Sequence, residues 1–169
     1  LAAQRCTHWH LHCIGSLDRD RAEAQRLLSL RDTLGLAQRV SFHGEVTETH
    51  LHEAMHNADL FVIAAWFEGY GMAVAEALAF GLPVVTTSVG AAPALLEPND
   101  PEGPQRDRAG LLVPAGDLGA LTQALDAILN DHGLRDELAA GARRRATQLP
   151  TWHGAGVCLA RVLEQVRAL

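Results

Sequence analysis

The stretch DLFVIAAWFEGYGMAVAEALAFGLPVVTT, residues 59–87, decides the fold of this chain. A short apolar run, Leu60 to Ala65, leads into a turn that contains two glycines, residues 67–71. Alanine and leucine then recur at helical spacing as far as Gly81, and a second apolar run follows at residues 84–87. This order predicts a strand, a turn, a helix and a second strand, which together form a βαβ unit with parallel strands.

The rest of the chain continues the alternation of strands and helices. We expect further strands at 9–14, 40–43 and 111–113, and further helices at 19–34, 49–58, 90–96, 117–129, 134–146 and 151–169. The expected N-terminal helix caps are Asp18, Thr47 or Thr49, and Asp117. The polar segment 97–108 interrupts regular structure and is predicted to be a loop insertion. The pattern predicts an α/β fold, a doubly wound parallel (Rossmann-like) sheet, in one domain over residues 1–169.

Composition limits the classes of function. The chain has 169 residues, 48% of them apolar, and a formal net charge of −6 without any lysine, so we expect no nucleic-acid partner. Its three cysteines, Cys6, Cys13 and Cys158, are widely spaced and are predicted to be free thiols in a reducing compartment. The chain opens on Leu1 rather than methionine, and we expect it to be a segment of a longer or processed protein.

The turn in the central stretch is suited to binding an anion. It follows a parallel strand, and ligands bind beyond the carboxyl ends of such strands. Its glycines allow close approach of the backbone, and the first turn of the next helix offers unpaired N–H groups. Glu68 precedes that helix and Glu76 lies within it, and sugar hydroxyls are good donors to both carboxylates. These features together indicate a sugar nucleotide.

The two glutamates, separated by seven residues and followed by Gly-Leu-Pro-Val-Val, resemble the signature of family 4 retaining glycosyltransferases. Two further segments are similar to that family. Residues 39–44, RVSFHG, resemble the strand before its glycine near the nucleobase, and residues 109–117, AGLLVPAGD, resemble the segment after its helix–strand unit. Several motifs in the same order make this resemblance specific, whereas Gly69-x-Gly71 alone would be weak. It covers the chain from about Trp9 to the end.

The resemblance implies a carboxyl-terminal, donor-binding domain of a two-Rossmann-domain enzyme. It implies that Glu76 holds the nucleotide ribose and that Glu68 acts at the donor sugar, near the anomeric centre. The other donor-binding residues that we expect are Gly69, Tyr70, Gly71, Met72, Ala73, Gly15 and Val46. No metal and no cofactor are implied. The expected donor is a UDP-, GDP- or ADP-linked sugar, and the expected acceptor is a glycan, a lipid or a small molecule.

This chain also departs from the family pattern. The family's domain begins with one more strand that carries a glycine and an arginine, with a lysine a few residues on, and these clamp the diphosphate. We expect this sequence to start after that strand and the amino-terminal acceptor domain to lie outside it. Either the sequence is a truncated segment or those parts belong to another chain. We therefore expect the isolated chain to be inactive or weakly active. The full-length protein is expected in the cytoplasm, with peripheral association at the inner membrane as a further expectation.

Two alternatives remain open. His52, Glu53 and His56 fit H-E-x-x-H, the zinc-hydrolase helix, although the apolar positions of that segment turn them toward solvent. His8, His10 and His12 alternate on one face of a strand and could also bind a metal ion. Ordinary polar packing explains these histidines more simply than a metal site does. The other alternative is a non-catalytic module that binds a partner through its crevice or its last helix.

Overall fold

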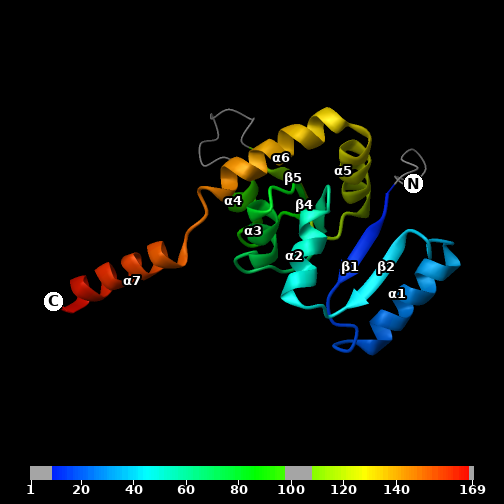
Figure 1. The fold of residues 1–169 in the computed structure, drawn as a ribbon, viewed down its shortest axis with the longest axis horizontal. Coiled ribbons are helices and arrows are strands. Elements are labelled where there is room, and N and C mark those ends of the chain that lie inside the picture. The colour runs from blue at the N-terminus through cyan, green and yellow to red at the C-terminus, as the bar shows by residue number, and fades with distance from the viewer. Residues whose placement is uncertain (1–8, 98–107, 168–169) are drawn as a thin grey trace.

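The structure is a computed structural model, and it describes residues 9–97 and 108–167 (Figure 1). Helices and strands alternate along the described chain, as the sequence predicts. In order they are β1 (Leu11–Ile14), α1 (Arg21–Thr33), β2 (Val40–Gly44), α2 (Glu48–His56), β3 (Phe61–Ile63), α3 (Met72–Ala79), β4 (Val84–Thr87), α4 (Ala92–Leu96), β5 (Gly110–Val113), α5 (Leu118–Asn130), α6 (His132–Ala146) and α7 (Trp152–Arg167).

The predicted βαβ unit is confirmed. Strands β3 and β4 pair in parallel, with Val62 opposite Val85, and α3 connects them. Strand β5 pairs in parallel with the other side of β4. All four residues of β4 are buried, because β4 is the middle strand of this three-stranded sheet.

The predicted α/β class is confirmed, but the expected single sheet is divided in two. Strands β1 and β2 form a separate parallel pair, and within the described residues no ladder joins this pair to β3. Leu11 donates its N–H to the carbonyl of Arg39, which directly precedes β2. Because successive residues of a strand point their N–H groups to opposite sides, the N–H of His12 faces the open side of β1. Phe61 donates its N–H to the carbonyl of Pro83, which directly precedes β4. By the same alternation, the N–H of Val62 faces the open side of β3.

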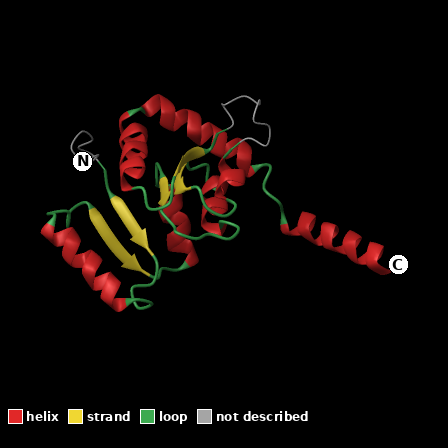
Figure 2. Ribbon diagram, turned by 180° about the vertical axis from the view of Figure 1, so that it is seen from behind, coloured by secondary structure: helices red, strands yellow, loops and turns green. Residues whose placement is uncertain are grey.

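Helices cover both faces of the β3–β4–β5 sheet (Figure 2). On one face Val84 packs with Leu78 of α3 and Leu96 of α4. On the other face Val85 packs with Ile128 of α5 and Leu138 of α6. Adjacent residues of β4 thus point into two different cores, as the alternation of side chains along a strand requires.

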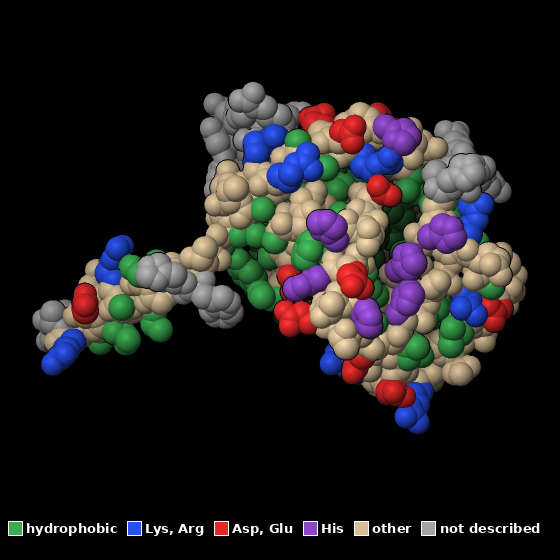
Figure 3. All heavy atoms as spheres, viewed as in Figure 1, with side chains coloured by type: hydrophobic (Ala, Val, Ile, Leu, Met, Phe, Trp, Pro, Cys, Tyr) green, Lys and Arg blue, Asp and Glu red, His purple; other side chains and the backbone are tan. Residues whose placement is uncertain are grey.

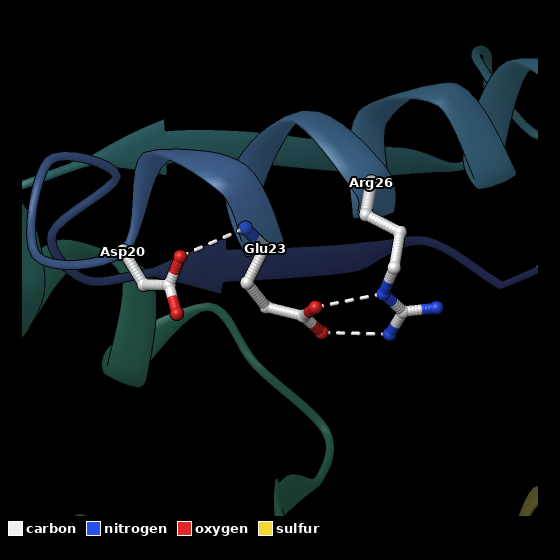
Figure 4. Close-up of polar contacts among 3 residues, drawn as sticks. All are labelled: Asp20, Glu23 and Arg26. Atoms are coloured by element: carbon white, nitrogen blue, oxygen red, sulfur yellow. Dashed lines mark hydrogen bonds and ion pairs between the residues drawn. The ribbon is translucent and has the colours of Figure 1, made fainter.

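Helix α1 is capped by Asp20 rather than by the expected Asp18 (Figure 4). The Asp20 carboxylate accepts a hydrogen bond from the N–H of Glu23 at 2.9 Å, whereas Asp18 pairs with Arg21. Arg26 donates two hydrogen bonds to the Glu23 carboxylate, at 2.7 and 2.6 Å, and these lower the pKa of Glu23. The helix buries no residue, so local contacts such as these contribute to its order.

The other expected caps are confirmed at Thr47 for α2 and Asp117 for α5. Helix α7 begins after Pro150 and extends away from the rest of the molecule (Figure 1). Four apolar side chains of α7 recur at helical spacing and are 54–64% exposed: Leu159, Val162, Leu163 and Val166. No helix among the described residues is both long enough and apolar enough to cross a membrane. Most of the predicted loop 97–108 lies outside the described residues.

Candidate functional site

The site begins where β3 ends, in the turn that leads into α3. Gly71 is the N-cap residue of α3, and its φ of +82° is a left-handed conformation that favours glycine. The carboxylate oxygen Oε1 of Glu68 accepts hydrogen bonds from the N–H groups of Gly69, at 3.0 Å, and Gly71, at 3.2 Å. The half-buried Glu68 side chain therefore folds back over the turn and fixes its shape.

The turn is held in place by the segment after β4. Ala91 donates its N–H to the carbonyl of Gly69 at 3.0 Å. Gly90, with φ +55°, lies so close that a Cβ there would stand 1.9 Å from the carbonyl oxygen of Glu68. The site thus depends on a close approach of two backbone segments that only glycine permits.

The start of α3 has N–H groups without an acceptor inside the helix. The first bond of the helical pattern runs from the N–H of Ala75 to the carbonyl of Gly71, at 2.8 Å. Met72 and Ala73 precede Ala75, so their N–H groups fall among those that a helix leaves unpaired at its start. Together with the helix dipole, these groups make a site for an anion.

Glu76 lies farther along α3 and is exposed to solvent. The buried face of the helix is formed by Val74, Ala77 and Leu78, and Glu76 projects from the remaining surface. Neither Glu76 nor Glu68 lines either of the two hollows described below. The structure shows the turn and both carboxylates on one short segment, but it does not join the carboxylates in a common pocket.

Gly15 and Val46 follow the two strands of the other sheet. Gly15 comes directly after β1 and donates its N–H to the carbonyl of Gly44 at 3.0 Å. Val46 is half-buried, two residues beyond the end of β2. Both therefore lie at the carboxyl edge of the β1–β2 sheet, which is separate from the sheet that carries the turn.

Two hollows lie near the turn, and each contains a residue that our sequence analysis did not single out. The first, of about 210 Å³, is lined by Tyr70 of the turn and by Arg145 of α6. Arg145 is only 6% exposed and donates to the carbonyl oxygens of Leu95, at 3.0 Å, and Ala94. In the sequence, Arg145 looks like its neighbours in a run of three arginines, so no local signal identifies it as the buried one.

The second hollow, of about 250 Å³, lies at the carboxyl edge of the β3–β4–β5 sheet. Its lining includes Trp66 after β3, Thr87 at the end of β4 and Gly116 after β5. Trp66 is nevertheless 80% exposed. The only sequence signal for Trp66 is its position two residues before Glu68.

The zinc-hydrolase interpretation finds no support in the arrangement of side chains. His52, Glu53 and His56 are exposed on α2, whose buried residue is Met55. Histidines gather on the face shown in Figure 3. Across the part of the chain that the structure describes, however, no three His, Cys, Asp or Glu side chains form a group that could hold a metal ion.

His12, the one histidine in β1, engages in polar packing. Nδ1 of His12 lies 2.9 Å from Nε2 of His43 on β2, and the two rings stack with centroids 5.1 Å apart. His8 lies outside the described residues. Of the three cysteines predicted to be free, Cys13 and Cys158 carry free thiols and Cys6 lies outside the described residues. Burial raises the pKa of Cys13.

Comparison with known proteins identifies relatives that are similar to this chain in sequence. The chain is 38% identical over 108 residues to the lipopolysaccharide core biosynthesis mannosyltransferase LpsB of Rhizobium meliloti (strain 1021), which covers 64% of this chain and 28% of that protein. It is 34% identical over 134 residues to the phosphatidyl-myo-inositol mannosyltransferase of Mycobacterium leprae (strain TN), covering 78% of this chain and 33% of that protein. The chain thus spans about a third or less of these relatives.

Solved structures share the fold. Sucrose-phosphate synthase from Thermosynechococcus elongatus superposes with a TM-score of 0.79 at 27% identity, over 99% of this chain and 41% of that one. Anabaena HepE, solved in complex with UDP, superposes with a TM-score of 0.77 at 22% identity, over 99% of this chain and 43% of that one. The sequence model of the family described as "Glycosyl transferases group 1" matches residues 1–131, and the chain belongs to this family.

Proposed function

We propose that this chain is the donor-binding domain of a retaining glycosyltransferase that uses a nucleotide diphosphate sugar. The observation that carries the proposal is the turn at residues 68–71, which joins the carboxyl end of β3 to the start of α3. It presents unpaired helix N–H groups beside a carboxylate, at the edge where parallel sheets bind ligands. Membership of the family favours glycosyl transfer over other uses of such an edge.

In this proposal the diphosphate lies at the start of α3, where the N–H groups of Met72 and Ala73 donate to its oxygens. Negative charge grows on the diphosphate as the sugar leaves, and donors that are already oriented stabilise it. The N–H groups of Gly69 and Gly71 hold Oε1 of Glu68, and we assign its second oxygen, Oε2, to the donor sugar. The backbone of Tyr70 completes the sugar contacts.

Glu76 is assigned to the ribose. Its exposed position on α3 allows the carboxylate to accept hydrogen bonds from two vicinal hydroxyls. Gly15 and Val46 are assigned to the phosphate and nucleobase side of the ligand. Transfer is proposed to keep the anomeric configuration and to proceed without a metal ion.

The open edges of β1 and β3 are consistent with one more parallel strand between them in the whole protein. Such a strand would pair with the N–H groups on the open sides, those of His12 and Val62 among them. It would also join the two sheets, so that Gly15 and Val46 would face the same crevice as the turn. For the whole protein, we further propose a separate half that binds the acceptor, an acceptor for the sugar, and a location in the cytoplasm.

The test is a calorimetric titration of the folded 169-residue chain with UDP, GDP and ADP. We expect weak binding of one nucleotide, and that nucleotide identifies the base. UDP is the first choice, because a solved structure that shares the fold contains UDP. Absence of binding by all three, in a sample that circular dichroism shows to be folded, would contradict the proposal.

A binding module without transferase activity is the second candidate, and helix α7 favours it. Leu159, Val162 and Val166 form part of an apolar face that is more than half exposed along a helix that extends from the molecule. Exposed apolar surface of this kind is typical of an interface. A folded chain that binds no nucleotide would leave this candidate as the better one.

A further inference from the structure

Trp66 lies beside the proposed donor site, and hydrogen bonds hold the backbone of the residue that precedes it. The preceding residue, Ala65, donates its N–H to Oγ1 of Thr87 at 3.1 Å, and that hydroxyl donates to the carbonyl of Ala65 at 2.7 Å. Thr87 is 3% exposed, so this pair of hydrogen bonds is shielded from water. The point at which Trp66 leaves β3 is therefore fixed against the end of β4.

The far end of the indole is also held in place. Gly116, with φ +78°, lies against the ring, and a Cβ at Gly116 would stand 2.4 Å from Cη2 of Trp66. Because Trp66 follows β3 and Gly116 follows β5, the side chain spans the carboxyl end of the central strand β4. The chain is thus held by hydrogen bonds just before Trp66, and the indole lies against Gly116, although 80% of the residue is exposed.

An exposed aromatic ring that starts from a fixed backbone position and rests against a neighbouring segment is suited to binding a ligand, because less conformational freedom is lost on binding. The hollow next to it has a volume of about 250 Å³. That is below the range of roughly 300–1,000 Å³ for drug-sized ligands, so it suits a single ring-sized group. Ala65, Val113, Pro114 and Leu121 provide apolar walls.

The position of the indole separates it from the diphosphate. The proposed phosphate site lies at the start of α3, whereas Trp66 reaches toward the start of α5 across the sheet edge. In the proposed arrangement a group bound on the indole therefore lies across the sheet edge from the diphosphate. We assign this side to an acceptor that the separate acceptor-binding half brings to the donor sugar.

We propose that Trp66 is a platform for the acceptor, and that its exposed indole packs against the C–H face of a pyranose or cyclitol ring. This inference rests on the proposed glycosyltransferase function and names the acceptor class for that site. The indole N–H adds one hydrogen-bond donor for a ring hydroxyl. Trp66 is thereby a binding and specificity residue, and it takes no part in bond cleavage.

The test is saturation-transfer NMR on the 169-residue chain with methyl α-D-mannopyranoside and myo-inositol as probes. We expect saturation of the ring C–H protons of one probe, and we expect Trp66→Ala to weaken binding roughly two- to tenfold, the range for loss of one aromatic contact. Trp66→Phe should retain most of the binding. Phe67→Ala is the matched control, because Phe67 is 86% exposed and is not among the residues that line the hollow.

Equal saturation in the parent chain and in Trp66→Ala would overturn the proposal, and so would the absence of saturation by both probes. A parallel nucleotide titration separates this result from the function proposed above. Trp66→Ala should bind the nucleotide as the parent chain does. Ring binding that depends on Trp66 in a chain that binds no nucleotide would support the platform while contradicting the donor site.

Discussion

Oε1 of Glu68 accepts a hydrogen bond from the N–H of Gly71, the N-cap residue of α3, at 3.2 Å. The glutamate that we assign to the donor sugar therefore also stabilises the start of the helix. Its carboxylate accepts from the N–H of the cap residue itself, whereas an N-cap side chain accepts from the second or third residue of the helix, so Glu68 fixes the turn that leads into α3 and leaves the N–H groups of Met72 and Ala73 to a ligand.

Replacing Glu68 by alanine should consequently lower the free energy of unfolding by about 1 kcal/mol, because the N–H groups of Gly69 and Gly71 lose their acceptor. Urea unfolding followed by circular dichroism measures this change. Glu137→Ala, at an exposed position in α6, is the control and should leave stability almost unchanged. An unchanged stability in Glu68→Ala would show that the hydrogen bonds within the turn contribute nothing.

Glu76→Gln should separate binding from stability. The side chain is exposed, so we expect the free energy of unfolding to change by less than about 0.5 kcal/mol. Nucleotide affinity should fall roughly tenfold, because a hydrogen bond to a charged group contributes more than one to a neutral group. Calorimetric titration with the nucleotide that the parent chain binds measures the loss. Affinity equal to that of the parent chain would remove Glu76 from the site.

Gly90→Ala should disturb the turn, because a Cβ at this position would clash with the backbone of Glu68 and Gly69. The new methyl group would stand 1.9 Å from the Glu68 carbonyl oxygen, and the φ of +55° is unfavourable for alanine. We expect a loss of more than about 1 kcal/mol in thermal unfolding. Gly69→Ala is the matched control, since nothing lies within 4 Å of a Cβ at that position. Similar stability of the two variants would mean that the turn can move away from Gly90.

Arg145→Met should destabilise the chain by at least about 2 kcal/mol, because the carbonyl oxygens of Ala94 and Leu95 would lose their charged donor. Methionine keeps much of the aliphatic volume, so the lost hydrogen bonds dominate the effect. Arg161→Met, at an exposed position in α7, serves as the control. Chemical denaturation of both variants gives the comparison, and equal stabilities would contradict the bracing role of Arg145.

The Glu23–Arg26 pair predicts a pH dependence of α1. Hydrogen bonding to Arg26 lowers the pKa of Glu23 from its ordinary value of 4.5. A carboxylate with a lowered pKa in the folded state contributes stability above its unfolded pKa and loses it as the pH falls through the folded value. The difference in stability between the parent chain and Glu23→Gln should therefore be constant near neutral pH and shrink in acid. A difference that does not change with pH would contradict this assignment.

The central unit was predictable because its signals are local. The apolar runs, the two glycines and the helical spacing all lie within residues 59–87, and the parallel pairing of β3 with β4 confirms the prediction. The cap of α1 was predicted two residues too early, whereas Thr47 and Asp117 were predicted correctly. Asp18 and Asp20 are the same residue type two positions apart. Asp20 is the cap because its backbone is extended and its carboxylate accepts from the N–H of Glu23.

The division into two sheets was not predictable from local pattern. Which strands pair depends on what lies between them in space, and the sequences of β1 and β3 carry no mark of an open side. Arg145 and Trp66 were missed for a related reason. Their defining partners, Leu95 and Gly116, lie 50 residues away along the chain in each case, so no spacing rule connects them.

Among the residues that the structure describes, β1 and β3 each have one side that pairs with no strand, and this has a consequence for samples of the polypeptide. Each presents backbone N–H and C=O groups that can accept a strand from any neighbouring molecule, and nothing in a parallel ladder prevents a foreign strand from pairing there. Leu11 and Ile14 add exposed apolar surface next to one of these rows. At high concentration such molecules can join side to side into polymers. A short synthetic peptide that pairs with these open strand edges would suppress that aggregation.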